Sequence, residues 1–383
     1  MLRISNVITR NEGCPSVARA LFVVLIGCLV VGISPPSPAL TFNLNDIGGV
    51  GAGSPAEAGF LAAAALWEAI FTDNVTVNLD VGFQDLDPGI LGQAGSVQAI
   101  YTYTAATGNL DADKTSTDDN MAVANLQAGS NFDMLLNRTA NSPNGSGSAT
   151  PFLDNDGDAN NSVIRMSNAN AKALGLLAPN ASGADAGITF NTDFSWDFDQ
   201  SDGVGAGLQD FVGVAAHEIG HAMGFISGVD ILDINSPPVN GPFDDDEFIF
   251  VSTLDLFRFS DDSLSAGGAG TIDWTADTRA KYFSIDGGST DLGGFSTGVN
   301  FGDGRQASHW KDNQGLGLMD PTANAAGQVN TISSLDIQAL DVIGWDLASE
   351  QTTIPEPGTF VLFTIAILSV LGYGWRRRRE PTQ

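Results

Sequence analysis

Apolar residues recur at helical spacing in some parts of the chain and alternate with polar residues in others. Residues 55–71 place apolar side chains on one face after Ser54, a residue type that caps helices, and predict an amphipathic helix. Residues 75–81 alternate strictly and predict a strand, and residues 188–191 predict a shorter one. Residues 211–223 combine small and apolar side chains and predict a buried helix.

The pattern becomes less regular toward the C-terminus. Residues 230–305 are rich in Gly, Asp and Ser, and they contain strand-like pieces at 248–251 and 254–259. Residues 332–347 predict a closing helix whose start, Ser333 to Asp336, has the form of a capping box. The chain is therefore expected to be an α+β protein with a mixed sheet, one buried helix and a mostly irregular C-terminal subdomain.

The predicted buried helix carries the sequence His217-Glu218-Ile219-Gly220-His221. Residues four apart lie on one face of a helix, so both imidazoles can reach one metal ion. Zinc accepts neutral imidazoles, and a catalytic zinc keeps one position open for water. Glu218 would act as general base toward that water. The protein has only three histidines, and two of them form this H-E-x-x-H arrangement of zinc peptidases.

A third zinc ligand has to come from another part of the chain. The longer pattern H-E-x-x-H-x-x-G-x-x-H holds through Gly224, and Ser227 then stands where the third histidine belongs; a hydroxyl is a poor zinc ligand. His309 is the remaining histidine, within Ser-His-Trp at 308–310. Asp230 and Asp233, just after the helix, are competing carboxylate ligands.

Together with Leu318-Met319, these stretches resemble the leishmanolysin branch of the metzincin peptidases, in which an insertion separates the second and third histidines. The resemblance makes His309 the third ligand and Met319 the methionine of the turn beneath the metal. It implies a metzincin-like zincin fold and one Zn²⁺ cofactor. The expected boundaries are a catalytic subdomain at 40–228, with the zinc-binding helix, and a C-terminal subdomain at 229–353, with the third ligand and the methionine turn.

The function expected from these residues is that of an exported zinc endopeptidase acting on a protein or peptide substrate. Two alternatives stay open. The first is a zinc-dependent hydrolase of a non-peptide bond, and the second is a catalytically degenerate extracellular matrix or adhesion protein. Intact His217, Glu218 and His221 argue against the second alternative, because loss of function would be expected to damage them.

The N-terminus has the features of a secretory signal peptide, which signal peptidase removes. Residues 1–39 contain arginines, then an apolar run, then small residues at 37–39. The sequence at 25–28 loosely fits a lipidation box, although apolar residues continue past it. Both cysteines, Cys14 and Cys28, lie in this segment, so the mature chain is expected to have neither a disulfide nor a thiol ligand.

The C-terminus resembles the PEP-CTERM sorting signal of Gram-negative bacteria, which an exosortase-type enzyme processes. Residues 354–383 contain Pro355-Glu356-Pro357, an apolar stretch long enough to span a membrane, and arginines at 376–379. Arginines favour the cytoplasmic side, so the catalytic region is expected outside the cytoplasm, at the cell surface or envelope, after transient membrane association. The alternative is a permanent C-terminal anchor.

Composition limits the remaining partners. The formal net charge is −29 at pH 7, which repels nucleic acid and anionic membranes. The acidic stretches at 154–158 and 244–247 suggest Ca²⁺, but Ala159 and Arg165 break the EF-hand pattern. Both stretches are expected to be solvated turns, with calcium as the less favoured interpretation.

Overall fold

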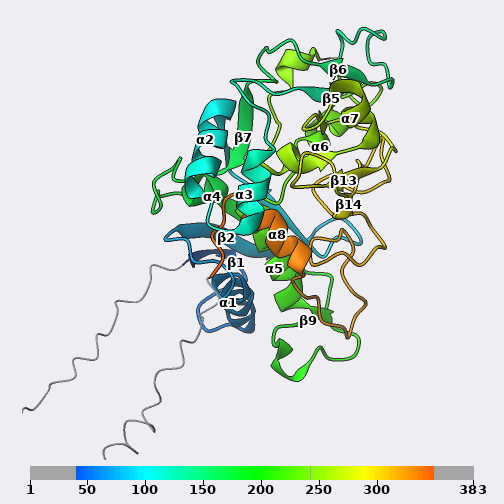
Figure 1. Ribbon diagram of the computed structural model, residues 1–383. Coiled ribbons are helices and arrows are strands. Elements are labelled where there is room, and N and C mark those ends of the chain that lie inside the picture. The colour runs from blue at the N-terminus through cyan, green and yellow to red at the C-terminus, as the bar shows by residue number, and fades with distance from the viewer. Residues whose placement is uncertain (1–39, 242, 349–383) are drawn as a thin grey trace, which may run out of the picture. The chain divides into compact units, whose positions relative to one another are not determined.

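The computed structural model describes residues 40–241 and 243–348 (Figure 1). The eight α-helices in this part of the chain are α1 (Pro55–Glu68), α2 (Tyr103–Asp113), α3 (Thr117–Ala124), α4 (Asn168–Ala173), α5 (Phe211–Met223), α6 (Val229–Ile234), α7 (Asp261–Gly267) and α8 (Ser334–Asp341). Its 3-10 helices are η1 (Gln200–Asp202), η2 (Asp245–Glu247) and η3 (Leu254–Phe257).

The strands form several small sheets, so the fold is mixed α and β. The strands are β1 (Thr41–Gly48), β2 (Thr76–Gln84), β3 (Gly92–Ser96), β4 (Gln98–Thr102), β5 (Met134–Leu136), β6 (Phe152–Asp154), β7 (Val163–Ser167), β8 (Ala186–Asn191), β9 (Trp196–Asp197), β10 (Gln209–Asp210), β11 (Arg258–Phe259), β12 (Ile272–Asp273), β13 (Lys281–Phe283) and β14 (Gly293–Phe295). The largest sheet has four strands in the order β1-β2-β8-β3. The expectation of a mixed sheet is confirmed, because β1, β2 and β8 are parallel and β3 is antiparallel to β8.

Both strands predicted from alternation belong to this sheet. In β2, Val77, Leu79 and Val81 are buried, as their alternation with polar residues requires of a strand with one covered face. The strand begins one residue later than predicted and extends to Gln84. The prediction for 188–191 falls within β8.

Helices α1 and α5 pack together beside the sheet (Figure 1). Ser54 caps α1 by accepting the backbone N–H of Glu57, as predicted, although the helix ends at Glu68 rather than residue 71. Gly59 of α1 lets the ring of Phe211 approach, since a β-carbon there would lie 2.6 Å from that ring. Phe190 of β8 lies 4.5 Å from Phe211 between ring centroids. The aromatic core therefore fixes the first residue of α5 against the sheet.

The strand predictions at 248–251 and 254–259 are wrong, except for Arg258 and Phe259, which form β11. Residues 248–251 are irregular, and residues 254–257 form η3. For residues 254–257 the cause is local hydrogen bonding, because Asp255 accepts the backbone N–H of Ser252 and donates its own N–H to the Ser252 hydroxyl. Such bonds compete with the hydrogen bonds of a strand ladder. The sequence nevertheless resembles a strand, because its apolar side chains are buried.

The closing helix is shorter than predicted. The capping box of Ser333 and Asp336 is confirmed, but α8 ends at Asp341 because Gly344 takes a left-handed conformation with φ 103°. Leu347 instead pairs with Phe71 in an isolated bridge. Residues 40–241 and 243–348 belong to one compact unit, and β12 pairs with β5 across the expected subdomain boundary at 228.

The expectation that both acidic stretches are solvated turns is wrong for two of their residues. Asp154 is 3% exposed and Asp245 is 6% exposed. The fold brings the two stretches together, although they appear in the sequence as separate features.

None of the helices within residues 40–241 and 243–348 is long and apolar enough to cross a membrane. The predicted signal peptide and sorting segment lie outside the described residues.

Candidate metal centre

Helix α5 begins and ends at the residues that the sequence predicted. Asp210 accepts the backbone N–H of Gly213 at 3.0 Å, which satisfies one free amide of the first turn. Gly224 ends the helix with φ 121°, a conformation that other residues rarely adopt. Trp345 donates its indole N–H to the Met223 carbonyl at 2.9 Å, so a buried acceptor at the helix end is also satisfied.

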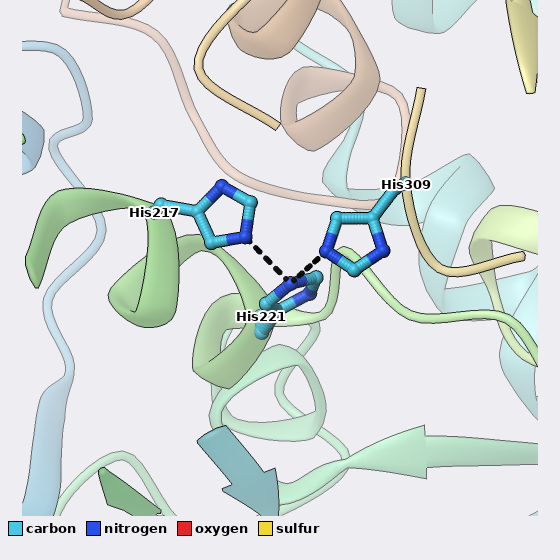
Figure 2. Close-up of side chains that lie close together, drawn as sticks. All are labelled: His217, His221 and His309. Atoms are coloured by element: carbon cyan, nitrogen blue, oxygen red, sulfur yellow. Dashed lines mark hydrogen bonds between the residues drawn. The ribbon is translucent and has the colours of Figure 1, made fainter. Parts of the chain in front are cut away.

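His217 and His221 point toward one place from the same face of α5. Their Nε2 atoms lie 3.1 Å apart. His309 arrives from a loop far along the chain, and its Nε2 lies 3.2 Å from that of His221 (Figure 2). All three ring nitrogens fall within 4.8 Å of one another. The structure thus brings together the three histidines that the sequence singled out.

This spacing fits a tetrahedral zinc site. Zinc–nitrogen bonds of about 2.0–2.1 Å at tetrahedral angles place neighbouring nitrogens about 3.3–3.4 Å apart. The two shorter nitrogen–nitrogen distances here are 3.1 and 3.2 Å, only slightly below that value. Three imidazole ligands also match the number that catalytic zinc sites take from protein.

The hydrogen bonds made by the Nδ1 atoms determine the tautomer of each histidine. His217 Nδ1 lies 2.7 Å from the Leu318 carbonyl, His221 Nδ1 lies 2.7 Å from the Phe225 carbonyl, and His309 Nδ1 lies 3.3 Å from the Gln306 carbonyl. A carbonyl only accepts, so each Nδ1 carries the hydrogen. In the neutral ring, Nε2 then has a bare lone pair, which is the form that binds metal.

Burial favours the same neutral form. It lowers the pKa of His217, and it lowers the pKa of His221 to about 3 together with the neighbouring charge of His217. Burial, followed by the charges of His221 and His217, holds the pKa of His309 well below its usual value. Three bare lone pairs facing one another repel unless a cation lies between them, so the residues fit a metal ion.

Met319, which the resemblance assigned to the turn below the metal, packs against α5. It is fully buried, and a β-carbon at Gly220 would lie 2.6 Å from its sulfur atom. Gly220 therefore leaves the space that the methionine fills. The same turn supplies the Leu318 carbonyl that accepts from His217.

Asp336 organises this region, a role that the sequence did not reveal. Its buried carboxylate accepts the backbone N–H groups of Leu318 at 2.7 Å and Met319 at 3.1 Å. It also accepts the indole N–H of Trp310, the residue after the third histidine, at 2.8 Å. The capping box marked Asp336 as the start of a helix, but it gave no sign of these longer-range partners.

Asp230, the alternative ligand, positions the third histidine instead of joining the histidine cluster. Its carboxylate accepts the backbone N–H of Ala307 at 2.6 Å, and the backbone N–H and hydroxyl of Ser308. Asp233 accepts the backbone N–H groups of Asn300 and Phe301. Both carboxylates therefore hold the loops that lead to His309. Among the described residues, the group of possible ligands at this place contains the three histidines and neither aspartate.

Ser227, at the position of the missing histidine, has other partners. Its hydroxyl donates to the Asp255 carboxylate at 2.6 Å, and its backbone N–H donates to the Ser308 hydroxyl at 2.9 Å. The serine thus helps to hold the loop before His309.

Glu218 lies in the cleft that contains the histidines. The cleft has a volume of about 1570 Å³, and its lining includes residues of β3 and residues 315–318. Burial raises the pKa of Glu218 to about 8. Strand β3 passes over the carboxylate at Gly92, where a β-carbon would lie 3.2 Å from Glu218 Oε1. A titratable carboxyl thus faces the same cleft as three converging imidazoles.

One comparison with known proteins identifies a segment of the chain. Residues 353–379 match the family model of the PEP-CTERM protein-sorting motif. No curated protein and no solved structure is significantly similar to this chain. The motif confirms the predicted sorting signal, which implies processing by an exosortase-type enzyme. The protein is exported and anchored at the Gram-negative cell envelope through this C-terminal segment.

Proposed function

We propose that the protein is an exported zinc-dependent endopeptidase of metzincin type, related in its site to the leishmanolysin branch. The observation that carries the proposal is the convergence of three Nε2 atoms from His217, His221 and His309, with Glu218 facing the same cleft. Further support comes from Met319 beneath the helix.

The histidines would hold the zinc ion, and the bonds from their Nδ1 atoms to main-chain carbonyls would keep the rings in the ligating form. When bound, zinc supplies Lewis-acid activation of water and of the substrate carbonyl group. Glu218 takes a proton from the attacking water and passes it to the leaving amine.

The cleft favours an extended peptide as substrate. Strand β3 is the last strand of its sheet within the described chain, and it lines the cleft beside the histidines. The free edge of a strand presents N–H and C=O groups that a peptide can pair with as an added strand. Glycines at 92 and 95 keep side chains away from part of this edge.

The test compares digestion of a casein-type protein by zinc-loaded wild type, Glu218→Gln and the surface control Glu68→Gln. Glu218→Gln should keep its zinc and lose about 10²–10⁴-fold in rate, whereas Glu68→Gln should match wild type. A wild type that holds zinc and cleaves esters but no peptide would favour the non-peptide hydrolase. If zinc-loaded Glu218→Gln digests casein at the wild-type rate, Glu218 is not the general base.

A further inference from the structure

Two acidic segments that lie far apart in the sequence meet at the end of β6. Asp154 ends β6, Asp156 follows it, and Asp245 begins η2. One carboxylate oxygen from each residue lies within 4.8 Å of the other two. Asp154 and Asp245 are buried, whereas Asp156 is exposed. Three carboxylates therefore converge, and two of them are buried away from solvent.

The described chain supplies no positive charge to this cluster. Within residues 40–241 and 243–348, no ion pair of 4.0 Å or less joins Asp154, Asp156 or Asp245 to a basic side chain. Burial and the charge of Asp245 raise the pKa of Asp154 to about 7, against the hydrogen bond from Asn160 that lowers it. Carboxylates gathered in this way repel one another unless a cation joins them.

The side-chain amide of Asn160 lies against the Asp154 carboxylate. The residue is fully buried, and its Nδ2 donates to Asp154 Oδ2 at 2.9 Å. Its Oδ1 is also buried and has no hydrogen-bond partner among the described residues. Rotating the Asn160 side-chain amide by half a turn exchanges the positions of Oδ1 and Nδ2. The amide oxygen would then face the Asp154 carboxylate, an arrangement that is stable when a cation lies between the two oxygens.

Neighbouring hydrogen bonds hold the carboxylates in place. Asn141 donates from Nδ2 to Asp245 Oδ1 at 2.5 Å and accepts the Asp245 backbone N–H at 3.2 Å. Asp156 Oδ1 accepts the backbone N–H of Asp158 at 3.2 Å. In both residues these bonds use Oδ1, so Oδ2 can face a ligand.

We propose that Asp154, Asp156, Asp245 and Asn160 form a calcium site that ties the end of β6 to η2. Four side-chain oxygens completed by water meet the six to eight oxygen ligands that calcium takes, whereas zinc prefers nitrogen and sulfur. Magnesium demands near-ideal octahedral geometry, which suits ligands from two irregular segments less well. Export places the site where calcium is available. The site is independent of the proposed peptidase activity.

The test titrates CaCl₂, and separately MgCl₂, into the mature zinc-loaded protein by calorimetry, with thermal unfolding in parallel. Wild type should bind one calcium ion per chain, and its Tm should rise by about 5 °C at a hundredfold excess over Kd. Asp156→Asn changes an exposed side chain and should therefore fold as the wild type does. It should bind calcium at least about tenfold more weakly. The exposed control Asp85→Asn should bind as wild type does.

Asn160→Asp separates a calcium site from a merely structural cluster. A fourth carboxylate should lower the Tm in the absence of calcium and enlarge the rise on adding it, relative to wild type. The proposal is overturned if calcium produces neither heat nor a shift in Tm, or if Asp156→Asn binds as tightly as Asp85→Asn. It is also overturned if magnesium raises the Tm as much as calcium at equal concentration.

Discussion

Trp310 donates its indole N–H to the buried carboxylate of Asp336 at 2.8 Å. Since Trp310 directly follows His309, this bond ties the third histidine to the start of α8. The same carboxylate accepts the backbone N–H groups of Leu318 and Met319. These two residues contact α5, because the Leu318 carbonyl pairs with His217 and the Met319 sulfur packs against Gly220. One aspartate therefore holds both segments that complete the histidine cluster.

Replacing Asp336 by Asn should destabilise the protein by about 2–5 kcal/mol, because the new amide group faces buried N–H donors and leaves at least two of them without an acceptor. Zinc affinity should also fall about 10–100-fold, since the ligand loops lose their support. Urea unfolding and zinc competition measure these effects. Asp111→Asn, on an exposed side chain of α2, should change stability by less than about 0.5 kcal/mol. Equal stability of the two variants would contradict this role.

Gly220→Ala should destabilise the protein by about 1–3 kcal/mol, although alanine is the better helix former, because its β-carbon would lie 2.6 Å from the Met319 sulfur. Gly108→Ala in α2 is the matched control. No atom lies within 4 Å of its new β-carbon, so this change should stabilise by about 0.5–1 kcal/mol. Thermal unfolding compares the two, and Gly220→Ala should cost less stability in a Met319→Ala background than in the wild type. Stabilisation by both alanines would show that Met319 does not press on the helix.

His309→Ala should weaken zinc binding more than Asp230→Asn does. The first change removes a ligand, whereas the second removes acceptors for the loop that carries it and should lower zinc affinity by about 10–100-fold. Competition with a chromogenic chelator measures both affinities. A greater loss from Asp230→Asn than from His309→Ala would make the carboxylate the ligand.

Asp73→Asn should stabilise the protein above neutral pH. Burial and the charge of Asp346 raise the pKa of Asp73 from 3.8 to about 7, so the folded state retains a proton that the unfolded chain releases. Stability due to this group is therefore lost as the pH rises from about 4 to about 7. Asparagine cannot ionise, and its oxygen can still accept the Asp346 backbone N–H.

Urea unfolding of both proteins at several pH values measures this gain. The advantage of Asp73→Asn should be absent near pH 4, grow up to about pH 7 and reach roughly 2–4 kcal/mol above it. An advantage of the same size at pH 5 and pH 8 would show that Asp73 is ionised throughout.

The parts of the site predicted from sequence are those fixed by neighbours in the chain. Asp210, the apolar pattern and Gly224 define α5, because capping and periodicity act within a few residues. His309 lies 88 residues from His221, so residue spacing alone could not join them, and the assignment rested on a resemblance.

The sequence carried little information where tertiary partners decide the outcome. Asp230 stayed open as a competing ligand because it is a carboxylate near the helix, and its partners in the structure lie 77 and 78 residues away. Asp154 and Asp245 looked like solvated turns because nothing in the sequence showed that their segments meet. In each case, an acidic side chain in an acid-rich sequence carries little information until its neighbours are known.

The most direct test of the central claim is a zinc titration of the metal-free mature protein, with bound zinc and casein digestion measured in the same samples. Digestion should be absent without zinc, rise in proportion to bound zinc, and level off at about one ion per chain. Full digestion by the metal-free protein, or a protein that binds one zinc ion per chain and digests nothing, would contradict the account.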